Sequence, residues 1–143
     1  MAALSADRNT VRRSGDRLVR PVEANANIHA GAIICLNAAG NAVPGSTSTT
    51  LKTDGACRKA ANNTGGIAGA MTVESYPGIY RLDNSAAGDA ITAAAIGTNC
   101  FVVDDHTVAL TSGGSTRSVA GKIVDVDATG VWVALGSPPY PTV

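Results

Sequence analysis

The chain has 143 residues, enough for one domain with its own hydrophobic core and no need of metals or disulfides. Its 11 basic and 11 acidic residues cancel, which argues against a nucleic-acid binder that relies on neutralising phosphates. Small and β-branched residues dominate and aromatic residues are scarce, a composition that favours short strands and turns and excludes disorder for the body of the chain.

Residues 1–17 carry arginines but no apolar period, so we expect an extended N-terminal arm without a core of its own. The last third of the chain is acidic, and a basic arm on an acidic body favours contact between copies or with a larger acidic surface. Nucleic acid and protein are both possible partners for the arm, and the neutral total and the lack of interleaved aromatics favour protein. The candidate contact residues of the arm are Arg8, Arg12, Arg13 and Arg17.

Residues 18–136 are expected to form a single β domain that begins with a strand over 18–23, where Pro21 indicates an edge position. A second strand over 30–36 is expected to form a hairpin with 42–43. The hydroxyl-rich stretch 46–54 is expected to be an exposed loop or a poorly packed strand. Further strands are expected over 67–74, 79–82, 100–104, 107–111, 120–126 and 131–135.

Many short strands at this spacing indicate a compact all-β fold, either a small barrel or a sandwich. One short helix is expected in the Ala-rich stretch 89–97, with Thr92 as a possible N-cap and Gly97 as its stop. Residues 137–143 form a Pro-rich tail that cannot join a ladder and is expected to be extended. Pro138, Pro139 and Tyr140 are its candidate contact residues.

Three cysteines, odd in number and without metal-ligand spacing, are expected to be free thiols. Cys35 and Cys100 lie in apolar strands, where cysteine acts as a small core residue. Cys57 has basic neighbours but no motif around it, so no role is assigned to it. Trp132 alternates with two valines and could face the core or a contact between copies, of which the core is favoured.

The main chemical finding is the absence of phosphate-binding loops, nucleophile elbows and zinc-protease motifs. His29 precedes a strand, and His106 lies in Asp104-Asp105-His106, which resembles a carboxylate–histidine pair but lacks a nearby nucleophile. A hairpin turn is strongly favoured there. Asp125 and Asp127 could chelate a hard cation, but a solvated face is preferred. We therefore expect no enzyme, cofactor or metal.

The N-terminus has no basic run followed by an apolar core, and no stretch approaches the roughly 20 apolar residues of a spanning helix. We expect a protein made in a cytoplasm and without a membrane anchor.

The sequence resembles a known group of proteins in two places. The first comprises the strand at 20–22, the segment 28–36, the turn at 37–40 and the segment 60–66. The second comprises the runs 97–111, 117–123 and 130–133. Together they resemble, over about residues 18–135, the small head decoration proteins encoded beside the major capsid gene in Mu-like and related tailed bacteriophages. These patterns report fold more than chemistry.

The resemblance implies a β domain that assembles as homotrimers at the local three-fold sites of a capsid. It would bind the major capsid protein on the outer surface of the virion and stabilise the head, with no direct contact to nucleic acid or membrane. The protein would be made in the bacterial host cytoplasm. The alternatives are another β structural component of the virion, such as a tail or baseplate protein, and more remotely a small enzyme.

Overall fold

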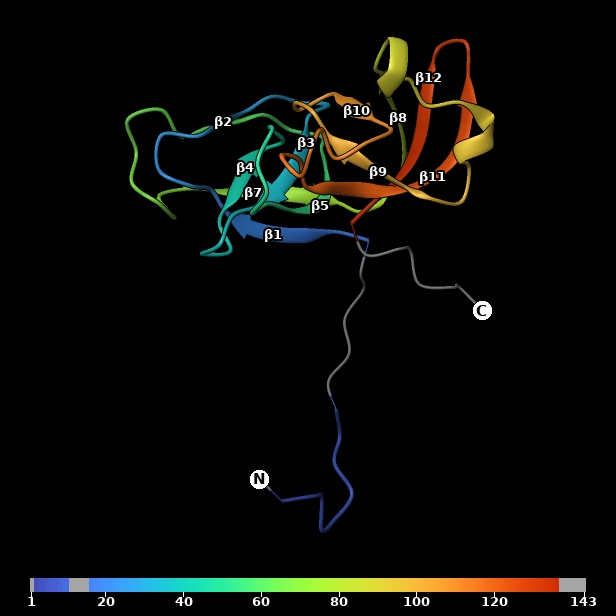
Figure 1. Cartoon of the computed structure of the whole chain (residues 1–143). Coiled ribbons are helices and arrows are strands. Elements are labelled where there is room, and N and C mark those ends of the chain that lie inside the picture. The colour runs from blue at the N-terminus through green and yellow to red at the C-terminus, as the bar shows by residue number, and fades with distance from the viewer. Residues whose placement is uncertain (1, 11–15, 137–143) are drawn as a thin grey trace.

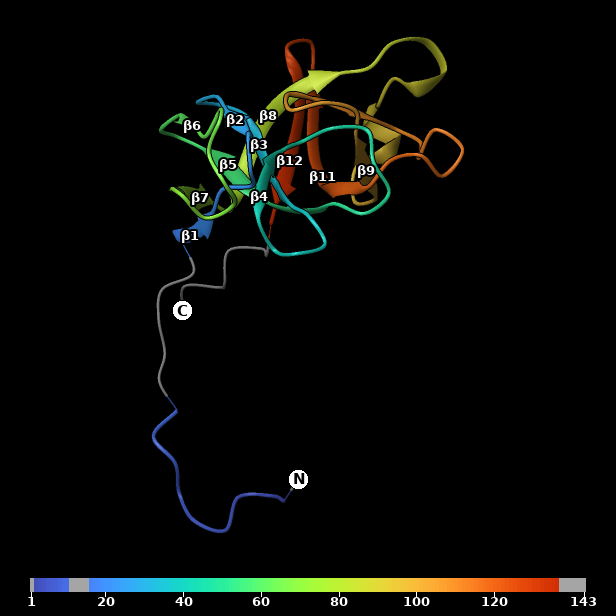
Figure 2. The ribbon, with the colours of Figure 1, turned by 90° about the vertical axis from the view of Figure 1, so that its left-hand side faces the viewer.

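The computed structural model describes residues 2–10 and 16–136 (Figure 1). Strands make up nearly all of its regular structure, so the expected compact all-β class is confirmed. Figure 2 shows two groups of strands side by side, a sheet that contains β1 and a barrel that contains β12. In the described part of the chain, no helix is long and apolar enough to cross a membrane.

Five strands close into a barrel in the order β10-β8-β12-β11-β9, with antiparallel neighbours except for the parallel pair β8 and β10. Alternate side chains point inward, as the period of two in a strand requires, so Val131, Val133 and Leu135 are fully buried. The barrel strands are β8 (Gly78–Asn84), β9 (Asn99–Val102), β10 (Thr107–Ala109), β11 (Val119–Asp127) and β12 (Gly130–Leu135).

The second group is a five-stranded antiparallel sheet in the order β1-β7-β5-β3-β4. The strand β1 lies at its edge, as Pro21 indicated, and the chain beyond it bends so that Val22 bridges to Ala42 of the opposite edge strand. The sheet thus curls toward closure. Its strands are β1 (Leu18–Pro21), β3 (Ile33–Leu36), β4 (Ala42–Pro44), β5 (Lys52–Cys57) and β7 (Thr72–Tyr76).

A two-stranded pair, β2 (Asn27–Ile28) with β6 (Ala61–Asn62), adds to a second apolar cluster under the curled sheet. Ile28, Ile34 and Val73 belong to this cluster. The buried side-chain amide of Asn63 donates to the carbonyl oxygens of Glu23 (3.0 Å) and Ile67 (2.9 Å), which fixes the adjoining loops.

Strand β3 joins the two apolar clusters, because Ile33 and Cys35 pack into the barrel cluster while Ile34 packs into the other. Hydrogen bonds cross the same junction: Ile33 N donates to Asp105 O (2.7 Å) and Thr53 Oγ1 donates to Val119 O (2.9 Å). Only Pro77 separates β7 from β8, so one nearly continuous strand runs from the sheet into the barrel.

The expected helix is a 3-10 turn at Ala93–Ala95, and a second such turn, which we did not expect, lies at Ala87–Asp89. Thr92 occupies the N-cap position of the turn at Ala93–Ala95 but makes no side-chain capping hydrogen bond. The segment is held instead by Asn84, whose side chain both donates to Ile91 O and accepts from Ile91 N, each at 2.8 Å.

The stretch 46–54 divides between the two expected alternatives. Residues 46–51 form a largely exposed loop, as expected, whereas Lys52 begins β5, a strand paired on both sides and buried from Asp54 to Cys57, so this end of the stretch is not poorly packed. The strand expected over 67–74 begins only at Thr72, and the short strands β2 and β6 were not expected. The expected hairpin between 30–36 and 42–43 is present as β3 and β4.

Candidate functional site

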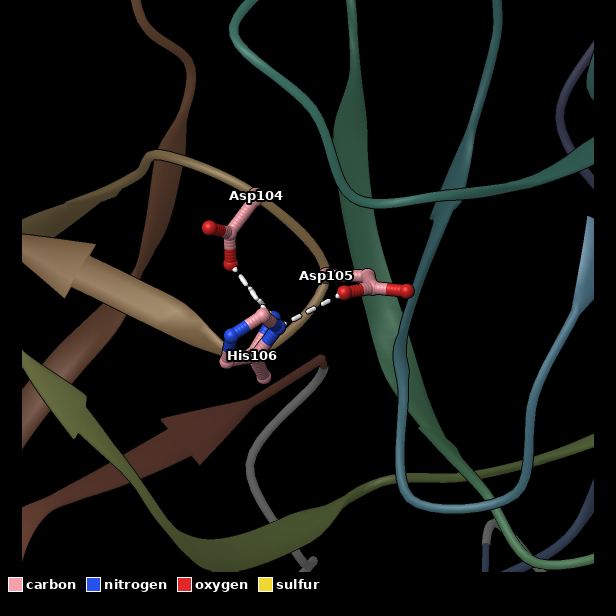
Figure 3. Close-up of side chains that lie close together, drawn as sticks. All are labelled: Asp104, Asp105 and His106. Atoms are coloured by element: carbon pink, nitrogen blue, oxygen red, sulfur yellow. Dashed lines mark hydrogen bonds and ion pairs between the residues drawn. The ribbon is translucent and has the colours of Figure 1, made fainter.

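Asp104, Asp105 and His106 form the turn between β9 and β10, and Figure 3 shows both carboxylates directed at the imidazole. Nδ1 of His106 lies 2.8 Å from Asp105 Oδ1 and 3.1 Å from Asp104 Oδ1. Asp104 Oδ1 also accepts from the backbone N–H of His106 (2.9 Å), a local bond that stabilises the turn. The turn that the sequence favoured here is therefore confirmed.

The hydrogen bond with Asp105 and the charge of Asp104 raise the pKa of His106, since a protonated imidazole is favoured beside carboxylates. Among the described residues this is the one group of three or more acidic, histidine or cysteine side chains close enough to share a metal ion. The partners of the imidazole recorded in the described chain are carboxylates, with Asp83 as the third at 3.9 Å. Among the described residues no hydrogen bond joins the imidazole to a hydroxyl or thiol, so the nucleophile–base contact of a catalytic triad is not formed here. His29 lies exposed between β2 and β3.

The arm residues divide into three groups. Arg8 lies in the exposed segment 2–10, while Arg12 and Arg13 lie outside the described residues. Arg17 is paired within the chain, where its guanidinium donates to Glu74 Oε1 at 2.8 Å. The tail candidates also lie outside the described residues: Pro138, Pro139 and Tyr140.

The Arg17–Glu74 pair belongs to a small charged network on the outer side of β7. Tyr76 Oη donates to the other carboxylate oxygen of Glu74 (2.8 Å), and Arg58 stacks 4.1 Å above the Tyr76 ring. The hydrogen bond to Glu74 raises the pKa of the Tyr76 phenol. These residues form an exposed charged surface, which can pair with a partner but holds no reactive group.

An ion pair with a buried carboxylate, which the sequence analysis missed, ties β1 to β5. Arg20 donates two hydrogen bonds to the Asp54 carboxylate, at 2.8 and 2.9 Å, and these bonds raise the pKa of the guanidinium. Asp54 is the extra residue of a bulge between β3 and β5. The pairing partners are far apart in the sequence, so no local pattern identified them.

Trp132 lies on the outer face of β12, and the expectation that it faces the core is wrong. Its indole N–H donates to Asp127 Oδ2 (2.9 Å), while Asp127 Oδ1 accepts from the backbone N–H and hydroxyl of Thr129. The bonds from Thr129, and then that from Trp132, lower the pKa of Asp127 to about 2. Asp125 and Asp127 are both exposed, as the solvated-face interpretation expected.

A groove of about 510 Å³ runs between the start of β5 and the start of β11. Hydroxyl, aliphatic and two cationic side chains line it, and its described lining includes no carboxylate, histidine or cysteine. It therefore offers no carboxylate or imidazole for general acid–base chemistry. Its walls include Leu51, Lys52, Thr53, Arg117 and Val119.

All three cysteines are buried and free, as expected for the two core positions. Burial raises the pKa of the Cys35 thiol to about 11 and that of Cys100 to about 12, and it also raises the pKa of Cys57. Thiols in this state are poor nucleophiles. Cys57 packs in the second apolar cluster and is therefore a core residue, a role that the sequence analysis did not assign to it.

The comparisons with known proteins do not assign the chain to a family. No protein-family model matches it, and no curated protein or solved structure matches it.

Proposed function

We propose that this chain is a structural virion protein that binds the outer surface of a phage capsid and stabilises the head. It acts as homotrimers at the local three-fold sites, with the major capsid protein and its own copies as partners. The proposal rests on the resemblance over residues 18–135 and on an all-β body whose class agrees with it.

The observation that carries the proposal is the contrast between a tightly bonded body and an exposed arm. Every residue of the segment 2–10 is exposed, including the apolar Leu4 and the cationic Arg8, and in Figure 1 this segment lies apart from the strands. An exposed segment with cationic and apolar side chains can bind along a neighbouring protein, and many such weak contacts become strong through repetition.

The described surface supports a binding role over a catalytic one. Its one acidic and histidine cluster is a hairpin turn, and the described lining of its groove between β5 and β11 includes no carboxylate or imidazole. We accordingly propose no enzymatic activity and no cofactor.

Light scattering followed by co-sedimentation tests the proposal on one sample. We expect purified protein to have the mass of three 14.3 kDa chains and to pellet with heads that lack it. The matched variant is a chain that begins at Asp16, which keeps the whole β body and should bind heads more weakly. A monomer that stays in the supernatant would contradict the proposal and direct attention to tail or baseplate structures.

A further inference from the structure

Three adjacent strands of the barrel present a row of unlike side chains on their outer face. Trp132 of β12 pairs with Arg81 of β8 on one side and with Asp125 of β11 on the other. The row therefore runs from a cation through an aromatic ring to an anion, across β8, β12 and β11. The turn that joins β11 and β12 points away from the five-stranded sheet (Figure 1).

Apolar side chains lie beside this row, on the side away from the β11–β12 turn. Ile79 of β8 and Val124 of β11 are 48% and 41% exposed, and Ala134 of β12 lies between Ile79 and Lys122. The hydrogen bond from the indole N–H to Asp127 holds Trp132 in one orientation. A preorganised tryptophan that borders exposed apolar side chains is typical of a binding hot spot.

The two charges of the row do not pair with each other within one chain. They lie on strands two positions apart, about 10 Å from each other. Among the described residues, neither Arg81 nor Asp125 belongs to an ion pair, since Arg81 donates to the Thr129 hydroxyl (3.3 Å) and Asp125 accepts from the adjacent Val126 N–H (2.8 Å).

We propose that this face binds a second copy of the chain across a two-fold axis that runs along β12. Such an axis exchanges the two flanking strands, so Arg81 of each copy lies opposite Asp125 of the other and the two Trp132 rings meet at the centre. Both charges gain partners in one symmetric contact, as an isologous interface requires.

The geometry also sets the strength of the contact. A five-stranded barrel is convex, so two copies touch in a narrow strip on either side of β12, much less than the area of a standard interface. The same axis brings Asp83 opposite Asp127 near the hairpin end, which opposes association. The contact is therefore weak and is reinforced where many copies lie close together.

This inference goes beyond the proposed function. A two-fold contact cannot build a trimer, but it can join one trimer to the next. It concerns the free protein, so its failure and the failure of head binding are separate results.

Charge exchange tests the proposal in sedimentation velocity runs on the full chain over a concentration series. Arg81→Asp and Asp125→Arg each place like charges together twice, and each should weaken association at least about 10-fold. The double variant R81D/D125R restores opposite charges and should recover most of the wild-type association. Lys59→Asp, a charge reversal on an exposed residue outside the barrel, is the matched control and should leave association unchanged.

The sole tryptophan supplies a second readout, because its emission should shift to shorter wavelength as concentration buries Trp132. The proposal is overturned by the absence of any concentration-dependent association, or by single variants that associate as the wild type does. It is also overturned if the double variant remains as weak as the single ones while circular dichroism shows it folded.

Discussion

Arg17 and Arg20 lie three residues apart, yet their ion pairs differ in burial and hence in energetic weight. The Asp54 side chain is 8% exposed, and its carboxylate accepts two hydrogen bonds from Arg20. The side chains of Arg17 and Glu74 are 56% and 42% exposed, and water solvates both charges. Removing one partner of a buried pair leaves an uncompensated charge, whereas exposed pairs contribute little.

We expect Arg20→Ala to lower the free energy of unfolding by about 2–4 kcal/mol, because it leaves the buried Asp54 carboxylate without its ion-pair partner. Arg17→Ala, the matched control, should cost at most about 1 kcal/mol. Urea unfolding followed by Trp132 emission measures both. Equal losses of unfolding free energy for the two variants would contradict the greater energetic weight of the Arg20–Asp54 pair.

The Asp127–Trp132 hydrogen bond makes a pH-dependent prediction. The pKa of Asp127 is about 2 in the folded chain, below its ordinary value of about 4, so the carboxylate stabilises the hairpin above pH 4. This stabilisation is lost as the pH falls toward 2. Trp132 emission should therefore stay constant above about pH 4 and change below it, while Asp127→Asn should remove the change. A Trp132 transition near pH 6, with the far-ultraviolet spectrum unaltered, would refute this assignment.

Local sequence patterns identified the turns and buried residues that depend only on neighbouring positions in the sequence. The turn at Asp104–His106 and the burial of Cys35 and Cys100 follow from residues on either side. Trp132 could not be placed, because a period of two buries either the tryptophan or its two flanking valines. The narrow barrel accommodates the smaller, branched valines, and Asp127 outside it accepts the indole N–H.

The strands with alternating apolar residues were predicted within a few positions, whereas β5 was anticipated only as a poorly packed alternative to a loop over 46–54. Lys52, Asp54 and Gly55 interrupt any apolar alternation, and the strand is nevertheless paired on both sides. Asp54 is accommodated by Arg20 from β1, and Gly55 by its close contact with β7, where an added Cβ would lie 2.6 Å from Ser75 Oγ. Both causes are tertiary, so no local propensity could reveal them.

Gly136 ends β12 in a left-handed conformation (φ +76°), and a Cβ there would lie 2.1 Å from the carbonyl oxygen of Asp54. Gly40 has nearly the same backbone angle (φ +84°) with nothing within 4 Å. We expect Gly40→Ala to cost about 1–2 kcal/mol for the backbone alone. Gly136→Ala should cost at least about 2 kcal/mol more because of the clash. Thermal unfolding compares the two, and an equal loss would show that the junction with β5 is loose.

Strand β3 makes the stability of the barrel and that of the curled sheet depend on each other. Ile33 packs in the barrel cluster, and its neighbour Ile34 packs in the second apolar cluster. Unfolding of β3 would therefore disrupt the packing of both clusters. A body of this kind should unfold in one transition.

We expect Ile34→Ala to lower stability by about 2–4 kcal/mol. Trp132 emission, which reports on the barrel, should reveal the same loss as circular dichroism of the whole chain, although Ile34 lies in the other cluster. Ile67→Ala is the control, since Ile67 is 77% exposed and its loss should have little effect. If the barrel signal kept its wild-type midpoint while the dichroism split into two transitions, the two groups of strands would be separate folding units.

Electron cryomicroscopy of phage heads that lack the protein, imaged with and without purified chain, shows directly where this molecule acts. We expect added density of three-fold symmetry at the local three-fold sites on the outer surface, with β bodies related by the three-fold axis. Heads without added density after incubation at saturating concentration, or density confined to the tail attachment site, would contradict this expectation.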